Sequence, residues 1–372
     1  MTKITNSTTN SIEFKKPSFE KFVAKPLEKP KPPQNQKKQF QNLPQLDSIV
    51  TVIPYKSLLR AGSYNLGPEQ ASSPVKCIKQ YLGRKGDKFY TIKILTLSEE
   101  KDTTDDVQGK TLIHTEHSLL SLEKDNENII GCVELFRETV VSTFLNKDTQ
   151  KMEERPLKRI CLVLDCQTGH DYSPSYTTLT NMQRYVIEKK KLTQSEAMTI
   201  FFKVAKIVLS LHTNNIVHRD IKLGNIIYDT KLKTSKLSNF CLGKHLSSEN
   251  DLLKDQRGSP AYISPDVISG KPYLGKPSDM WALGVTLYTM LFGQFPFYDA
   301  SPTELFRKIK SGVFTIPTDI NVDLKIEKLI QNLLILDPSL RLTAAKTVKE
   351  AESIIFDQIS LMEEGGLLSQ LL

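Results

Sequence analysis

Three residues in one short segment have the types and the spacing that phosphoryl transfer requires. The segment reads His218-Arg219-Asp220-Ile221-Lys222-Leu223-Gly224-Asn225. The carboxylate of Asp220 can accept the proton of a substrate hydroxyl, and the amide oxygen of Asn225 can ligate a metal ion that bridges nucleotide phosphates. The ammonium group of Lys222 can neutralise the phosphoryl group in transit. The segment therefore predicts a phosphate-transfer centre built on Asp220, Lys222 and Asn225.

This segment resembles the catalytic loop of protein kinases, and the lysine at position 222 is similar to that of the serine/threonine type. Further landmarks of the family follow in the expected order, and the resemblance covers roughly residues 60–355. They are the end of an activation segment at 258–266, the central buried helix at 279–284 and a closing motif at 336–341. The resemblance implies a bilobal fold in which Arg341 pairs with Asp266. Ser247 and Ser248 lie in the activation segment, where a phosphate could meet Arg219.

Upstream, Tyr90-Thr91-Ile92-Lys93 resembles the strand whose lysine holds the nucleotide phosphates in kinases. Glu116 follows 23 residues later on an expected helix, where the family places the partner of that lysine. The resemblance implies an ion pair that positions phosphates, and a plain strut between the lobes explains the pair equally well. It also implies that Leu164 and Cys166, beside the segment that joins the lobes, belong to the cofactor pocket.

The tripeptide that holds the metal in kinases is altered. Where the family has Asp-Phe-Gly, this chain has Asn239-Phe240-Cys241. Magnesium prefers anionic oxygen ligands in near-ideal octahedral geometry, and Asn239 keeps an oxygen but loses the charge. Cys241 adds a β-carbon where glycine permits unusual backbone angles. The resemblance thus makes Asn225 and Asn239 the metal ligands and predicts that Asn239 is an impaired one.

The phosphate-binding loop is altered as well. Kinases use G-x-G-x-x-G there, because bare backbone N–H groups then reach the phosphates. One register fills the three glycine positions with other residues, namely Ala71, Ser73 and Lys76. It also places Pro74, which has no N–H to donate, inside the loop. The other register starts at Gly67 and brings in the carboxylate of Glu69. Either register predicts a poor cradle for phosphate.

These two changes predict impaired binding of ATP and Mg²⁺. A metal ion supplies several kcal/mol of transition-state stabilisation, and losing about 4 kcal/mol slows a reaction roughly a thousandfold. We therefore expect a pseudokinase, for which no cofactor is expected. The alternative is a weakly active protein serine/threonine kinase that uses ATP and Mg²⁺ and transfers the γ-phosphate with Asp220 as its base.

The resemblance is narrower than the kinase family as a whole. The stretches 239–246, 252–257 and 258–267 resemble the Tribbles-related pseudokinases. This resemblance implies a scaffold for signalling proteins that regulates transcription pathways, in the cytoplasm and the nucleus. The group recruits a ubiquitin ligase through a Val-Pro-acidic peptide after the kinase-like domain. No proline follows Pro338 in this chain, so that motif is not seen here.

The basic character of the chain is concentrated near its start. The sequence has 372 residues, with 50 Lys and Arg against 42 Asp and Glu, and residues 1–40 hold nine lysines and three glutamates. Such a segment buries too little apolar surface to offset the entropy of ordering, so residues 1–45 are predicted to be a disordered basic tail. The remainder has no basic stripe with interleaved aromatics, so nucleic acid is not an expected partner. No apolar run is long enough to cross a bilayer, so no membrane partner is expected either.

Hydrophobic periodicity predicts the elements that must position these residues. Strands are expected at 63–70, 75–82, 88–97, 129–144 and 159–164, a helix at 105–122, and a polar loop at 145–158. Helices dominate afterwards, and Thr193 and Glu196 have the spacing of a capping box that opens one of them.

A sheet-rich part followed by a helical part predicts an α+β chain. We expect a protein-kinase-like fold with a small, mainly antiparallel-β N-lobe carrying one helix, a large helical C-lobe, and a cleft between them. The expected domain spans 46–356, with lobes over about 60–165 and 166–356, and residues 357–372 form a short C-terminal tail.

Overall fold

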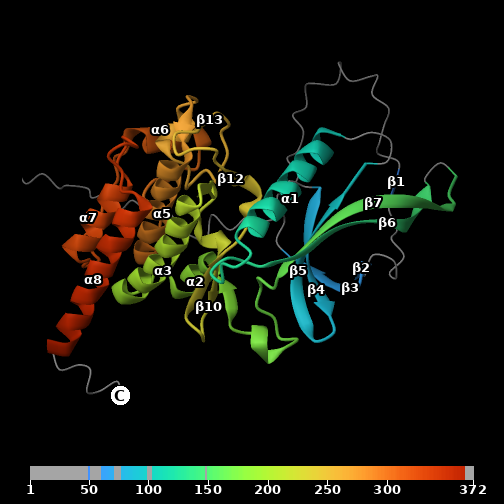
Figure 1. Cartoon of the computed structure of the whole chain (residues 1–372), viewed down its shortest axis with the longest axis horizontal. Helices are drawn as coiled ribbons and strands as arrows, with labels where there is room; N and C mark the ends of the chain where they lie inside the picture. Colours follow the sequence, from blue (N-terminus) through green and yellow to red (C-terminus); the bar gives the residue numbers. More distant parts are fainter. Residues whose placement is uncertain (1–48, 51–59, 71–76, 99–102, 147–148, 365–372) are drawn as a thin grey trace, which may run out of the picture.

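The computed structural model describes residues 49–50, 60–70, 77–98, 103–146 and 149–364, which form a sheet-rich lobe and a helical lobe (Figure 1). This α+β, bilobal architecture confirms the predicted fold class. The tail predicted at 1–45 lies outside the described residues.

The N-lobe is a seven-stranded antiparallel sheet with the order β1-β6-β7-β5-β4-β3-β2. The strands are β1 (Ile49–Val50), β2 (Arg60–Ala61), β3 (Tyr64–Glu69), β4 (Ile78–Lys85), β5 (Lys88–Thr96), β6 (Cys132–Asn146) and β7 (Met152–Asp165). The central strand β5 is buried on both faces from Thr91 to Leu95, as its β-branched and apolar residues favour. Lys93 therefore projects from a rigid part of the sheet.

The polar loop expected at 145–158 is mostly strand. β6 runs to Asn146 and β7 starts at Met152, and their antiparallel pairing extends out to Leu145 opposite Met152. Before Arg159, β7 does not pair with β5, so β6 and β7 project together as a two-stranded ribbon (Figure 1). A ribbon with exposed faces needs no apolar alternation, which is why periodicity indicated a loop.

Helix α1 (Thr104–Leu122) lies against the sheet and contacts the C-lobe segment at 240–242. It starts with a full capping box, in which Thr103 and Asp106 satisfy each other's backbone N–H groups. Its buried face includes Glu116 among apolar residues, Leu112, Ile113, Leu119 and Leu120. The helix therefore carries a carboxylate into the space between the lobes.

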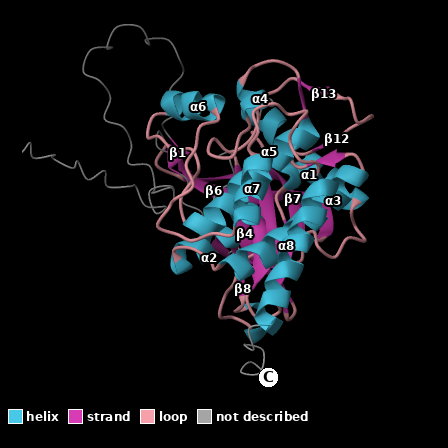
Figure 2. Ribbon diagram, turned by 90° about the vertical axis from the view of Figure 1, so that its left-hand side faces the viewer, coloured by secondary structure: helices cyan, strands magenta, loops and turns pink. Residues whose placement is uncertain are grey.

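The C-lobe is built on a helix that is buried on every side. This helix, α5 (Gly275–Phe292), is buried and mostly apolar from Met280 onward, as a helix in the middle of a core must be. The other α-helices are α2 (Met182–Lys189), α3 (Gln194–Thr213), α4 (Pro265–Ile268), α6 (Pro302–Ser311), α7 (Leu324–Leu333) and α8 (Ala344–Glu364). Figure 2 shows α3, α5, α7 and α8 packed together. α8 continues past residue 356, the expected end of the domain.

The C-lobe also contains short strands and 3-10 turns. The strands are β8 (Leu179–Asn181), β9 (Ile216–Val217), β10 (Ile226–Asp229), β11 (Thr234–Leu237), β12 (Lys244–His245), β13 (Leu252–Leu253) and β14 (Tyr273–Leu274). The 3-10 turns are Pro174–Tyr176, Leu223–Asn225 and Phe240–Leu242. The antiparallel pair of β10 and β11 therefore places Asn225 just before one strand and Asn239 just after the other.

Of two contacts expected from the sequence, the Arg341–Asp266 pair is present and the capping box at 193–196 is incomplete. Arg341 donates to both carboxylate oxygens of Asp266, at 2.8 and 3.2 Å, so the expected pair is present. At the start of α3, Thr193 caps the N–H of Glu196, but the Glu196 carboxylate accepts from the hydroxyl of Tyr185 instead of completing a capping box. None of the helices in the described ranges is both long and apolar enough to cross a membrane.

Candidate active site

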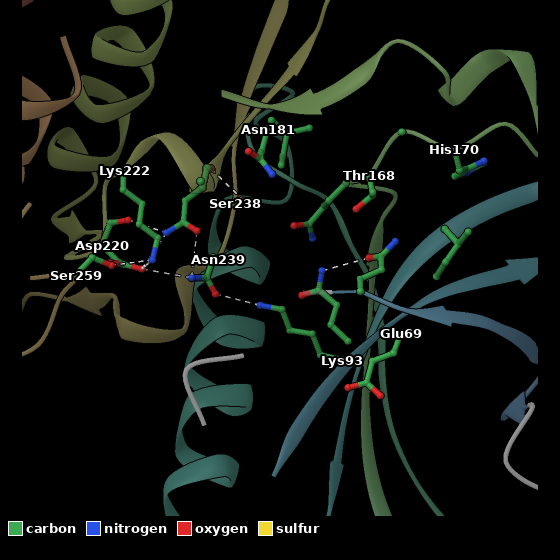
Figure 3. Close-up of a pocket in the computed structure, with 18 of the residues that line it drawn as sticks. Glu69, Lys93, Thr168, His170, Asn181, Asp220, Lys222, Ser238, Asn239 and Ser259 are labelled. Carbon is green, nitrogen blue, oxygen red and sulfur yellow. Dashed lines mark hydrogen bonds and ion pairs between the residues drawn. The ribbon is translucent and has the colours of Figure 1, made fainter. Parts of the chain in front are cut away.

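A cleft of about 1040 Å³ separates the lobes (Figure 3). Strands β3 and β4 form one wall, residues 167–172 after β7 form the back, and the C-lobe turns form the other wall. Five of the residues singled out from the sequence line it together, namely Lys93, Asp220, Lys222, Asn225 and Asn239. The fold thus gathers side chains from β5, from the segment before β10 and from the segment after β11.

Lys93 and Glu116 form a buried ion pair at the inner end of the cleft. The lysine Nζ lies 2.8 and 2.7 Å from the two carboxylate oxygens of Glu116, and both residues are less than a tenth exposed. The same Nζ lies 3.1 Å from Oδ1 of Asn239. A lysine ammonium has three N–H donors, and each of them has an acceptor here. Lys93 therefore has no N–H left for a phosphate oxygen.

A buried carboxylate on helix α5 anchors the loop that carries Asp220. Asp279, on α5, accepts from the backbone N–H groups of His218 and Arg219, both at 2.8 Å, and contacts the ring of His212 at 3.1 Å. Burial opposes ionisation, but the hydrogen bond and charge of His212 hold the pKa of Asp279 below its usual range. Because Asp279 stays charged, its hydrogen bonds fix the loop backbone. They hold it in a conformation in which Arg219 has a positive φ of 66°.

Asp220 is surrounded by donors. Its Oδ1 accepts from the hydroxyl of Ser259 at 2.7 Å, and its Oδ2 lies 2.9 Å from both Lys222 Nζ and Asn225 Nδ2. Lys222 also donates to the Ser259 hydroxyl at 2.7 Å. Asp220 and Lys222 are thus held close together in the arrangement that proton acceptance and charge neutralisation require.

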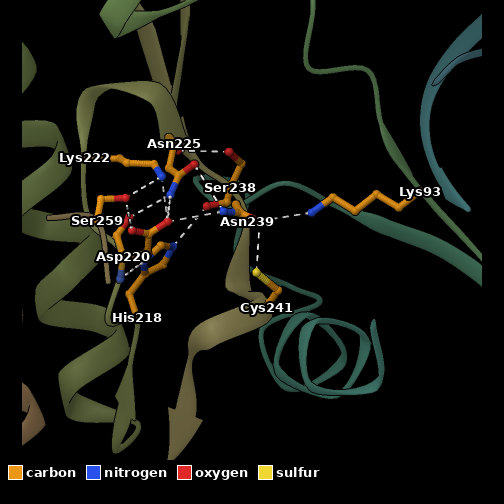
Figure 4. A network of polar contacts seen from close by, with 9 residues as sticks. All are labelled: Lys93, His218, Asp220, Lys222, Asn225, Ser238, Asn239, Cys241 and Ser259. Carbon is orange, nitrogen blue, oxygen red and sulfur yellow. Dashed lines mark hydrogen bonds and ion pairs between the residues drawn. The ribbon is translucent and has the colours of Figure 1, made fainter. Parts of the chain in front are cut away.

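Asn239 fills the space between Lys93 and the Asp220 loop (Figure 4). Its Oδ1 accepts from Lys93 and from Cys241 Sγ, while its Nδ2 lies 3.3 Å from Asn225 Oδ1 and 3.5 Å from Asp220 Oδ2. The partners fix this orientation, because an ammonium can only donate and a carboxylate can only accept. The residue has a left-handed backbone with φ 67°, a conformation that asparagine tolerates better than most residues.

The donor set does not fit Mg²⁺. The amide oxygens of Asn225 and Asn239 both accept hydrogen bonds already, and an N–H group of Asn239 points where a cation would meet Asn225. Of Asp220, Asn225 and Asn239, only Asp220 has a carboxylate. Mg²⁺ requires anionic oxygens in octahedral geometry, so this set supplies too little negative charge. Elsewhere in the described ranges, no group of three or more His, Cys, Asp and Glu side chains could hold a metal ion.

The other site residues expected from the sequence have different outcomes. Leu164 and Cys166 are buried in the core and do not line the cleft. Ala71, Ser73 and Lys76, the expected glycine-loop positions, lie outside the described residues. Glu69 does line the cleft, where it pairs with Lys79 at 3.1 Å.

Two contacts in the cleft were not anticipated from the sequence. The Ser259 hydroxyl occupies Oδ1 of Asp220, and the backbone N–H of Gln167 donates to the buried hydroxyl of Thr91 at 3.1 Å. Both join residues far apart in the chain, so spacing alone gives no signal for them. The only available hint was that Ser259 lies in the motif at 258–266.

Comparisons with known proteins identify the family of this fold. A model of the protein kinase domain matches residues 70–351. A relative from Gallus gallus named serine/threonine-protein kinase 40 is 51% identical over 314 residues, which is 83% of this chain and 72% of the relative. The protein of the same name from Homo sapiens is 50% identical over 315 residues, again 83% and 72% of the two chains. A probable serine/threonine-protein kinase HSL1 from Saccharomyces cerevisiae is 36% identical over 165 residues, which is 44% of this chain and 11% of the relative. The chain belongs to the protein kinase family.

Proposed function

We propose that this kinase-like protein is a pseudokinase, which acts as a signalling scaffold and regulator of transcription pathways rather than through phosphate transfer. One observation carries the proposal: the Asn239 amide stands between Lys93 and Asn225 and donates an N–H group where a kinase holds a cation. A neutral donor in that place both removes a ligand charge and blocks the neighbouring amide oxygen.

The saturation of Lys93 supports the same proposal. All three of its N–H donors have acceptors within 3.1 Å, so a phosphate would have to displace Glu116 or Asn239 to reach it. Glu116 is only 1% exposed, and a carboxylate cannot be left buried without a partner at low cost. The Lys93–Glu116 pair then serves as the strut between β5 and α1.

The partners we propose are signalling proteins, met in the cytoplasm and the nucleus, as the resemblance to Tribbles-related pseudokinases implies. A ubiquitin ligase is a partner of that group, but the Val-Pro-acidic peptide is not seen in this chain. We propose no nucleic-acid or membrane partner.

Calorimetric titration of the full chain with ATP tests the proposal. We expect no binding at micromolar ATP, with or without Mg²⁺ or Mn²⁺. Micromolar binding that depends on the metal and disappears in Lys93→Met would overturn it. The Lys93→Met variant must stay folded for this comparison, which its circular dichroism spectrum at the titration temperature establishes.

The alternative is a weakly active serine/threonine kinase, and the retained arrangement of Asp220 and Lys222 favours it. The relatives' printed names also describe kinases. This function predicts slow transfer of the ATP γ-phosphate to protein serine or threonine, with loss of transfer in Asp220→Ala and no loss in a distant surface variant such as Lys349→Ala. Transfer that survives Asp220→Ala would come from a contaminating kinase and would count against the alternative.

A further inference from the structure

The activation segment, residues 239–265, is held at several points by the body of the C-lobe. β12 pairs with β9, and β13 pairs with β14, in each case as an antiparallel pair. Between these two strands of the segment, Glu249 contacts Lys276 of α5 at 3.1 Å. These contacts order the segment up to residue 253.

Just after these points, Arg219 and Asp255 form a further contact between the segment and the loop that carries Asp220. The guanidinium Nη2 of Arg219 lies 2.6 Å from Oδ1 of Asp255, and the hydroxyl of Tyr273 bonds both to this nitrogen and to the backbone oxygen of Asp255, at 3.1 Å each. The second carboxylate oxygen lies 2.6 Å from Nε of Arg257. A single carboxylate thus bridges two guanidinium groups, of which that of Arg219 is only 6% exposed.

An anion between arginines is the arrangement that a phosphate group creates when it orders a kinase activation loop. Asp255 supplies an anion at this place from the chain itself. Burial opposes its ionisation, but the charge and hydrogen bond of Arg219 hold its pKa below the usual range. The carboxylate is therefore permanently charged near neutral pH, and a kinase that adds phosphate is not needed to provide the charge.

We propose that Asp255 is a positioning residue whose carboxylate takes the place of a phosphate group on Arg219 and holds the activation segment in this conformation without phosphorylation. Four residues later in the chain, Ser259 donates to Asp220, so the same anchor holds the segment that covers the Asp220 carboxylate. The inference does not depend on whether the cleft binds a nucleotide.

The serines singled out from the sequence are poorly placed for this role. The backbone N–H of Ser247 and the hydroxyl of Ser248 both donate to the carboxylate of Asp251, at 2.6 and 3.2 Å. A phosphate on either hydroxyl would meet this carboxylate, and like charges repel. Nη2 of Arg219, meanwhile, is already occupied by Asp255.

Amide hydrogen exchange on the full chain, after phosphatase treatment, tests the proposal. In the wild type we expect residues 252–258 to stay protected. Asp255→Asn keeps the shape but removes the charge, and we expect it to speed exchange of these residues at least about tenfold, because one neutral acceptor oxygen replaces the carboxylate that bonds the guanidinium groups of both Arg219 and Arg257. The matched control Asp251→Asn changes the same residue type in the same segment and should leave residues 252–258 within about twofold of the wild type.

A second variant separates the anion from any general packing role of Asp255. We expect Asp255→Ser to exchange as fast as Asp255→Asn, and a phosphate carried on the introduced hydroxyl to restore protection. Exchange in α3 and α5 of the same molecules reports whether the lobe as a whole stays folded. The proposal is overturned if phosphatase loosens the wild-type segment, if Asp255→Asn and Asp251→Asn behave alike, or if the added phosphate restores nothing.

Discussion

Replacing Asn239 by aspartate tests the account of the cleft most directly. The change removes the N–H donors that face Asn225 at 3.3 Å and Asp220 at 3.5 Å and places a second carboxylate beside that of Asp220. Two long hydrogen bonds are worth about 1 kcal/mol together. Two like charges at this separation repel by about 4 kcal/mol at an effective dielectric constant of about 20, and the nearby ammonium groups of Lys93 and Lys222 offset most of this.

We therefore expect Asn239→Asp to lower the free energy of unfolding by about 2 kcal/mol in the absence of divalent ions, which is about 4–8 °C in Tm. The new carboxylate, with Asp220 and Asn225, also makes a set that suits Mg²⁺. If the variant binds Mg²⁺ with a Kd of about 1 mM, about 10 mM Mg²⁺ restores about 1.4 kcal/mol of stability. Differential scanning fluorimetry, with NaCl at matched ionic strength as the reference, measures both shifts.

Asn181→Asp is the matched control for this experiment. Asn181 lines the same cleft, but its side chain caps α2 by accepting from the N–H of Arg184, a role that aspartate fills equally well. We expect its Tm to stay near that of the wild type and to be insensitive to Mg²⁺. The reasoning is refuted if Mg²⁺ stabilises the wild type as much as Asn239→Asp, or if Asn239→Asp costs no stability without the ion.

Three further predictions concern buried charges. Lys93→Met should lower the unfolding free energy measured in urea by about 3–5 kcal/mol, since it leaves Glu116 buried without its cation, and the double variant Lys93→Met/Glu116→Gln should lose less; equal losses would contradict this. Arg341→Leu should cost about 3 kcal/mol in the same assay, because Asp266 then loses the cation that holds the end of the activation segment; a loss within error of zero would exclude this anchoring role. Burial lowers the pKa of His218, so below pH 6.5 the unfolded chain binds more protons than the folded one. Stability should fall by up to about 1.4 kcal/mol between pH 6.5 and 5.5, and His218→Phe should flatten this slope; a slope unchanged in that variant would contradict the prediction.

The sequence predicted which residues meet in the cleft better than it predicted how they meet. The resemblance to kinases implied that Lys93 and Glu116 pair, and the two side chains do form an ion pair. The orientation of Asn239 could not be predicted, because it depends on Lys93, 146 residues away. The same holds for the choice of Asp255 as the partner of Arg219, since the sequence offers several anions in the activation segment.

The errors in the predicted secondary structure had a similar cause. Residues 152–158 include three charged residues in a row, 153–155, and have no fully buried position, so a pattern that reports burial gives no strand signal there. The pairing with β6 alone makes the ribbon. Likewise, Glu196 was expected to close a capping box from local spacing, but Tyr185, on the preceding helix, takes its carboxylate.

The charges of the cleft explain why a single neutral residue has such wide effects. Lys93 is balanced by Glu116 and Lys222 is balanced by Asp220, while Asn225 and Asn239 are neutral, so the ionised groups of the centre sum to zero without any bound ion. With aspartate at position 239 the same centre would carry one excess negative charge, and a bound cation would lower its energy. A kinase centre of that kind depends on its metal for charge balance, whereas this one is complete in the unliganded protein. The order of the cleft is then a property of the chain alone, which agrees with the scaffold role proposed above.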